Sequence, residues 1–162
     1  MNDIYQDSTG TTWLAGNLGG LYRFRNARFQ AIPNSSGLTS EAINAIQDDG
    51  RGNLWFSSNR GISRIGLKDL NDFADGKISS LSPVTYGVAE GMKSIECNAG
   101  FPGDWRTRDG RIWFATMRGV VAVDPDAGDR LPPTVVIEEA WAGRVKLGGA
   151  RADFGEGRQQ HV

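Results

Sequence analysis

The chain has 162 residues, which is enough for one domain or for one domain and a fragment. Its 18 basic and 19 acidic residues nearly cancel, which argues against a nucleic-acid partner held by net charge. The single cysteine, Cys97, excludes an internal disulfide and a metal site of four cysteines. No apolar stretch approaches the ~20 residues of a membrane span, and the first residues lack the pattern of a signal peptide.

A short unit recurs three times along the chain. Asp, Gly and Trp have the same spacing in Asp7–Trp13 and Asp49–Trp55, which are 42 residues apart, and Thr107–Trp113 is a third copy with Thr in place of Asp. A period of about 40–45 residues that contains several short strands is typical of a β-propeller blade.

The second unit shows the expected strands most plainly. Ala42–Gln47 predicts the innermost strand, Asp49–Asn53 a turn, and Leu54–Ser58 and Gly61–Gly66 the next two strands. The candidates for fourth strands are Phe29–Ile32 and Val84–Tyr86.

Two stretches interrupt the repeat. The longer one covers about Leu67–Leu81, where apolar residues at i, i+3 and i+6 predict one or two helical turns. The shorter one contains Phe101–Asp104 and predicts a loop or bulge, and the first strand of the last unit has no clear signal.

The repeat ends after Pro125. A linker is predicted at Leu131–Pro133, a strand at Thr134–Trp141, a tight turn at Ala142–Arg144 and a partner strand at Val145–Leu147. This pattern predicts the opening hairpin of a different β domain.

The Asp-x-x-Gly-x-x-Trp unit, the Gly-apolar pair after it and the Gly-Leu-Thr-Ser segment at 37–40 resemble the two-component regulator propeller repeat. The last unit, with Asp109–Thr116 and Pro132–Glu138, resembles a final blade and its exit into an Ig-like "Y_Y_Y" domain. The resemblance covers about residues 3–147. It implies an all-β fold, with four-stranded antiparallel β-propeller blades in residues 1–130, the first incomplete. The first hairpin of a truncated Ig-like β-sandwich would follow in residues 131–162.

Such repeats build the sensor region of many bacterial receptors. The resemblance therefore implies a ligand-sensing, periplasmic segment of a membrane-anchored receptor whose output module is a histidine kinase or, alternatively, a diguanylate cyclase. The chain itself is then no enzyme. Two alternatives stay open: a propeller lyase or glycoside hydrolase, with Glu90 and Glu96 as acid and base, and a purely structural assembly protein.

Strand alternation predicts one candidate binding face. If Ala42–Gln47 is innermost, several polar loop residues share the face at which the strand begins, namely Ser40, Asn59, Arg60, Lys93, Ser94 and Arg118. Arg60 and Arg118 occupy equivalent positions, which suits an anionic ligand such as an acidic oligosaccharide through bidentate pairing. The alternative interpretation is that all six are solvated loop residues.

The other repeated residues have a structural interpretation. We expect Trp13, Trp55 and Trp113 to pack between neighbouring sheets, and the Asp-Gly turns to be Asx turns, not calcium sites. The sequence thus predicts neither a metal nor a cofactor. Because a propeller needs about 4–8 blades, we expect the chain to associate with missing blades of the same protein or with further copies of itself.

Overall fold

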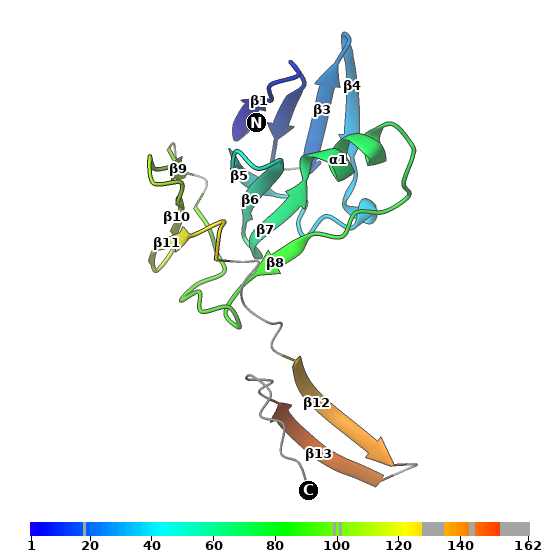
Figure 1. Ribbon diagram of the computed structural model, residues 1–162, viewed down its shortest axis with the longest axis vertical. Helices are drawn as coiled ribbons and strands as arrows, with labels where there is room; N and C mark the ends of the chain where they lie inside the picture. The colour runs from blue at the N-terminus through cyan, green and yellow to red at the C-terminus, as the bar shows by residue number, and fades with distance from the viewer. Residues whose placement is uncertain (18, 99, 101, 128–134, 143–144, 153–162) are drawn as a thin grey trace, which may run out of the picture. The chain divides into compact units, whose positions relative to one another are not determined.

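The computed structural model describes residues 1–127 except 18, 99 and 101, together with the backbone of residues 135–142 and 145–152. These residues belong to two compact units, Met1–Pro125 and Asp126–Val162 (Figure 1). The predicted domain boundary at residues 130 and 131, like the predicted linker, lies outside the described residues.

The first sheet is antiparallel and contains β1 (Asp3–Gln6), β2 (Thr12–Ala15), β3 (Leu21–Arg25) and β4 (Arg28–Ile32) in chain order. The sequence predicted an incomplete first blade, whereas this sheet has all four strands. Its innermost strand is only four residues long and has a polar residue at each end, so it gave no clear sequence signal. A short 3-10 helix, Asn34–Ser36, leads to the second sheet.

The second sheet has the same order, with β5 (Ile43–Asp48), β6 (Asn53–Ser58), β7 (Gly61–Gly66) and β8 (Val84–Tyr86). The strand predictions for this unit are confirmed to within one residue at each end. The predicted helical turns are also confirmed, because α1 (Leu67–Ala74) lies between β7 and β8.

The third sheet contains three strands among the described residues: β9 (Asp104–Arg106), β10 (Ile112–Thr116) and β11 (Gly119–Val123). β9 begins at the end of the stretch predicted as a loop or bulge. Three residues are too few to show an alternating pattern, which explains why the sequence left this strand unplaced. Cys97 makes an isolated antiparallel bridge to Thr116 at the end of β10. Cys97 therefore pairs with the same strand as β9 does, although it precedes the shorter interruption of the repeat.

In the compact unit Asp126–Val162, β12 (Val135–Ala142) pairs with β13 (Val145–Ala152) in antiparallel register. The register shifts around Ala140. The predicted hairpin is thus present. The Ig-like assignment stays a prediction, and the residues of the predicted tight turn, Gly143 and Arg144, lie outside the described residues.

The three sheets of the compact unit Met1–Pro125 lie beside one another, since β5 of the second sheet contacts both β1 of the first and β9 of the third. One apolar cluster fills the space between the first and second sheets, and Trp13, Leu54 and Phe56 are buried there. A second cluster between the second and third sheets contains Trp55 and Phe114. Each buried Trp therefore faces the sheet that follows it in the chain.

A buried carboxylate fixes each of these tryptophans. The Oδ1 atom of Asp49 accepts hydrogen bonds from the backbone N–H groups of Arg51 (2.8 Å) and Asn53 (3.1 Å), and its Oδ2 atom accepts from Trp55 Nε1 (3.1 Å). Burial raises the pKa of Asp49, but these hydrogen bonds and one from the Asn53 side chain outweigh it and lower the pKa below 3.8. Asp7 makes the same link to Trp13 at 3.2 Å.

The third unit lacks this link because Thr107 stands in place of the aspartate. The Thr107 hydroxyl instead lies within hydrogen-bond distance of two acceptors, the Asp109 carboxylate and the Arg111 carbonyl. Within the described residues, the buried Nε1 of Trp113 has no hydrogen-bond partner. A buried donor without a partner costs about 1–3 kcal/mol, so the third sheet is the least stabilised at this turn.

Substitutions at the two equivalent turn positions, 49 and 107, should change the free energy of unfolding in opposite directions. We expect Asp49→Thr to lower the free energy of unfolding by ~2–3 kcal/mol, because it leaves Trp55 Nε1 unsatisfied as Trp113 Nε1 is now. We expect Thr107→Asn to raise it by ~1 kcal/mol. Asn provides an acceptor for Trp113 without placing a second negative charge beside Asp109. Urea unfolding, followed by tryptophan fluorescence, measures both.

The Asp49 contribution should also depend on pH. Because its pKa is lowered in the folded chain, the stabilisation is present above the ordinary value of 3.8 and is lost as the pH falls through the folded value. The difference between the parent and Asp49→Thr should therefore shrink in acid. A difference that stays constant down to about pH 2 would contradict a role for the ionised carboxylate.

Candidate functional site

The three sheets of the compact unit Met1–Pro125 have one end in common, here called the loop end. At this end β5 begins and the β6–β7 hairpin turns back. Antiparallel pairing places the following described residues there: 16, 17, 19 and 20, and the segments 37–42, 59–60, 87–98 and 117–118.

Backbone hydrogen bonds join these segments from sheet to sheet. Ile43 N–H donates to the Gly16 carbonyl at 3.1 Å, and Cys97 N–H donates to the Ser58 carbonyl at 3.0 Å, which is the same contact one unit later. Met117 N–H donates to the carbonyl of Glu96 at 3.0 Å. The loop end is therefore one connected surface across the three sheets.

The two candidate arginines lie on hairpins of the same local geometry. Arg60 N–H donates to the Ser58 hydroxyl at 3.0 Å, and Arg118 N–H donates to the Thr116 hydroxyl at 3.3 Å. Each hydroxyl in turn donates to the carbonyl of the glycine that follows the arginine. Both arginines are exposed, so each is presented to solvent by a hydrogen-bonded hairpin.

The other four predicted residues also lie at the loop end, but most of their polar atoms serve the loops themselves. The Ser40 hydroxyl is buried and contacts Asn59 Oδ1 at 3.1 Å. The Ser94 hydroxyl accepts from the Glu96 N–H at 3.2 Å, and Lys93 is exposed. The structure thus brings Ser40 and Asn59 into contact, and ligand binding by the six residues stays a prediction.

Sequence reasoning missed a pair of asparagines at this end. Asn2 Nδ2 donates to the Ile43 carbonyl at 2.9 Å, and Asn44 Nδ2 donates to the Cys97 carbonyl at 2.8 Å. Each asparagine therefore links the start of an innermost strand to the following sheet. The signal was available, because Asn2 and Asn44 are 42 residues apart, as the repeat requires.

A second residue that sequence reasoning missed is Asp104, which occupies in the third repeat the position of Ile46 in the second repeat. Among the residues that the structure describes, its Oδ2 atom is buried and has no hydrogen-bond partner. Burial raises the pKa of Asp104 to about 6, the negative charge of Asp3 adds to the rise, and a hydrogen bond from Gln47 opposes it. A carboxyl thus occupies an apolar position beside β5.

The acid–base pair of the enzyme alternative has another role in part. Glu90 Oε2 accepts a hydrogen bond from the Gly87 N–H at 2.7 Å and so caps its own loop. Glu96 is exposed and contributes its backbone carbonyl to the contact with Met117. No group of three or more His, Cys, Asp or Glu in the described residues could hold a metal ion.

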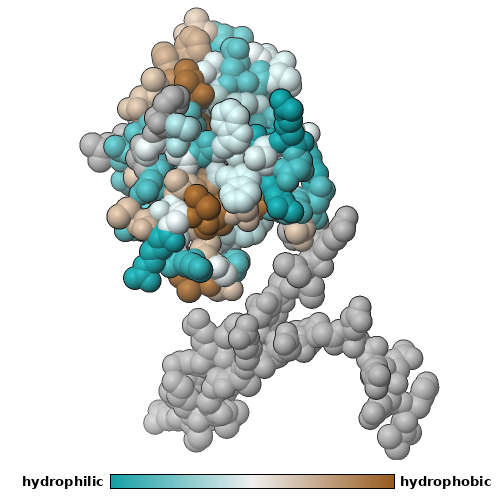
Figure 2. Space-filling view, turned by 90° about the vertical axis from the view of Figure 1, so that its left-hand side faces the viewer, coloured by the Kyte–Doolittle hydropathy of each residue, from teal (hydrophilic) through white to brown (hydrophobic). Residues whose placement is uncertain are grey.

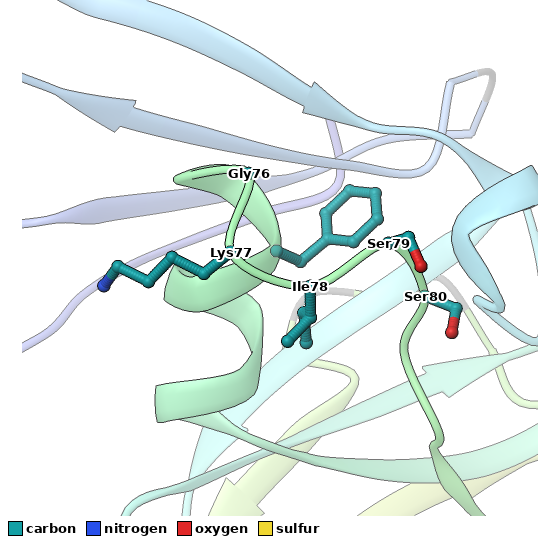
Figure 3. Close-up of a pocket in the computed structure, with 6 residues that line it drawn as sticks. Gly76, Lys77, Ile78, Ser79 and Ser80 are labelled. Atoms are coloured by element: carbon teal, nitrogen blue, oxygen red, sulfur yellow. The ribbon is translucent and has the colours of Figure 1, made fainter.

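The compact unit Met1–Pro125 has an open hollow of about 860 Å³, and none of the predicted site residues lines it. It lies where the chain leaves α1, and Figure 3 shows the side chain of Lys77 pointing away from Ser79 and Ser80. Its lining residues are Phe73, Gly76, Lys77, Ile78, Ser79 and Ser80. Among the described residues, no helix has both the length and the apolar character needed to cross a membrane.

A family model described as "two component regulator propeller" matches residues 37–60, from the segment before β5 to the Arg60 hairpin. Residues 37–60 thus carry one two-component regulator propeller repeat. No curated protein matches the chain.

One similar solved structure is the extracellular domain assigned to the hybrid two component system BT3049 of B. thetaiotaomicron. It has 28% sequence identity and a TM-score of 0.63, and the match covers 89% of this chain. The chain spans 18% of the length of that relative. Together with the repeat, this similarity supports a propeller-type fold built from antiparallel sheets.

The Asp104 carboxyl generates a pH prediction. Since its folded pKa is raised from 3.8 to about 6, its charge costs stability above about pH 6 and costs nothing below 3.8. Such a rise corresponds to roughly 3 kcal/mol at most, and solvent around the half-buried group reduces this to ~1–2 kcal/mol. We expect Asp104→Asn to stabilise the chain by that amount at pH 8 and by almost nothing at pH 4.

Urea midpoints of the parent and Asp104→Asn at the two pH values measure the effect. Asp109→Asn is the control, because Asp109 is an exposed carboxylate whose pKa is lowered by a hydrogen bond from Thr107. An equal gain for Asp104→Asn at both pH values would show that the buried charge does not cause it.

Proposed function

We propose that this chain is the ligand-sensing, C-terminal part of a periplasmic sensor propeller, and that its loop end binds an anionic ligand such as an acidic oligosaccharide. The observation that carries the proposal is the pair of matched hairpins, which present Arg60 and Arg118 from neighbouring sheets at one end. A guanidinium pairs with a carboxylate or sulfate through two parallel hydrogen bonds. Lys93 adds a third exposed cation at the same end.

The parent protein is proposed to be a membrane-anchored two-component receptor. The similarity to the extracellular domain of a hybrid two component system supports this, and it favours a histidine kinase over a diguanylate cyclase as the output. The chain would transmit ligand occupancy through the Pro132-Pro133 junction to the Ig-like domain that the sequence predicts.

Further blades of the same protein are the proposed partners on the open face of the first sheet. Phe29 is 68% exposed and Ile4 is 56% exposed on that sheet, and Leu14 helps to line a hollow of about 510 Å³ there. The residues one repeat later, Ile46 and Phe56, are buried against a preceding sheet. The open face thus has the composition of a packed one.

The third sheet has a corresponding face on its other side. Trp105 is 65% exposed and Val120 is 67% exposed, and Trp113 is only half-buried, although Trp55 is fully buried by the sheet that follows it. Figure 2 looks onto the side that carries the third sheet and shows hydrophobic and pale residues at the surface. A further sheet of the same kind would cover them.

The ligand proposal predicts a charge-dependent loss of affinity. We expect Arg60→Ala and Arg118→Ala each to weaken binding of a carboxylate-bearing oligosaccharide by ~1.5–3 kcal/mol, the scale of a charge-assisted hydrogen bond. Arg60→Lys should recover only part, because an ammonium cannot make the bidentate pair. Titration calorimetry on the complete propeller, with an acidic and a neutral oligosaccharide of equal length, measures the difference.

Arg108→Ala is the matched control, because Arg108 is an exposed arginine in the turn at the opposite end of the third sheet. It should leave the affinity unchanged. If the two loop-end variants bind every acidic oligosaccharide as tightly as the parent does, Arg60 and Arg118 are not part of the site.

The partner proposal predicts that the isolated 162-residue chain associates. Light scattering should report a mass above the 17.6 kDa of one chain at micromolar concentration, because apolar faces of this kind are rarely left open. Phe29→Lys should lower the mass. Val88→Lys should not, although Val88 is equally exposed at 68%, because Val88 lies at the loop end. A monomer with both sheet faces open would contradict the proposal.

A further inference from the structure

The insertion at residues 67–81 interrupts the second sheet, yet much of it packs against the first. It leaves β7 as helix α1 and returns to β8, and Figure 1 shows α1 beside β3, β4 and β7. Leu70 is fully buried and Leu81 is 5% exposed in the cluster between the first two sheets. The insertion therefore extends the interface between these sheets toward its rim.

Polar contacts from the first sheet hold the end of α1. Arg23 on β3 is 4% exposed although it carries a charge, and its guanidinium donates to Asn71 Oδ1 at 3.0 Å and to Asp75 Oδ1 at 2.6 Å. It also donates to Gln30 Oε1 at 3.0 Å, and Gln30 Nε2 donates to the Ala74 carbonyl at 2.7 Å. Two side chains of the first sheet thus cap the helix of the second.

These contacts add to the stability of the helix end, where the backbone N–H groups of residues 75–77 already bond the carbonyls of residues 71–73. An eight-residue helix is marginal in water, and its last carbonyls need partners from outside the helix. A cation near the C-terminal end also interacts favourably with the helix dipole. The hydrogen bond from Arg23 lowers the pKa of Asp75, so the pair is charged at neutral pH.

The far end of the insertion is tied to the chain that leads to the loop end. Leu81 N–H donates to the Ser36 carbonyl at 2.6 Å. Gly37 follows with a φ of 105°, and a Cβ atom there would clash with the Leu81 carbonyl oxygen. Leu38 is buried in the same cluster as Leu81. Segment 36–42, which contains Ser40, is therefore supported by the insertion.

We propose that residues 67–81 form a clasp between the first and second sheets, and that Arg23 is the positioning residue that keeps the clasp and segment 36–42 in place. Arg23 acts through α1 and Leu81, and it does not itself lie at the loop end. The proposal is independent of the ligand, because each contact is within the chain.

Hydrogen exchange of the 162-residue chain, followed by mass spectrometry, tests the clasp. Arg23→Met should raise exchange at least tenfold in residues 67–81 and also in residues 36–42, and it should leave β10 and β11 unchanged. Arg23→Lys should show a smaller rise, because an ammonium retains the charge but not the planar set of donors. Arg25→Met is the control, since Arg25 is an exposed arginine on the same strand.

Each outcome decides the proposal. Parent-like exchange of residues 67–81 in Arg23→Met overturns the clasp. A rise there without a rise in residues 36–42 overturns the support of the loop end. If Arg23→Met does not fold, Asn71→Ala replaces it, because this change removes one acceptor of Arg23 and leaves the buried charge paired with Asp75. It should then raise exchange in both segments, and parent-like exchange would again overturn the proposal.

Discussion

A buried carboxylate that binds a turn and an indole at once is the interaction on which the first two sheets depend. Asp7 and Asp49 each accept hydrogen bonds from the backbone of their own turn and from the tryptophan six residues later. This contact fixes the turn between the first two strands and also directs the indole toward the following sheet. Local geometry and packing between sheets are thereby set by one side chain.

The opposite end of the sheets is organised by a different contact. Asn2 and Asn44 reach the backbone carbonyls of Ile43 and Cys97 in the following sheet. The carboxylates bond within their own sheet at one end, and the amides bond the following sheet at the other end, so the innermost strands of the first two sheets are fixed at both ends. The hairpins that carry Arg60 and Arg118 therefore lie at an end where neighbouring sheets are hydrogen-bonded to each other.

Departures from the repeat mark where the units differ in physical behaviour. Thr107 leaves the indole of Trp113 without its acceptor, and Asp104 introduces a carboxyl at a position that is apolar in the second sheet. The insertion at residues 67–81 adds an interface that the third sheet does not share. The first two sheets are consequently the more strongly coupled pair.

The sequence by itself determined the repeat, the four strands of the second sheet, α1 and the hairpin β12–β13, because spacing and local pattern specify short-range structure. It also placed the six candidate residues at one end, since strand alternation follows from the order of the turns. Only the tertiary structure decided that Arg23 caps α1 and that Asn44 reaches Cys97. These contacts join residues about 50 positions apart, and no local periodicity encodes which distant donor meets which carbonyl. The same reason hid β9, because its three residues are defined by their pairing with β10 and not by their own pattern.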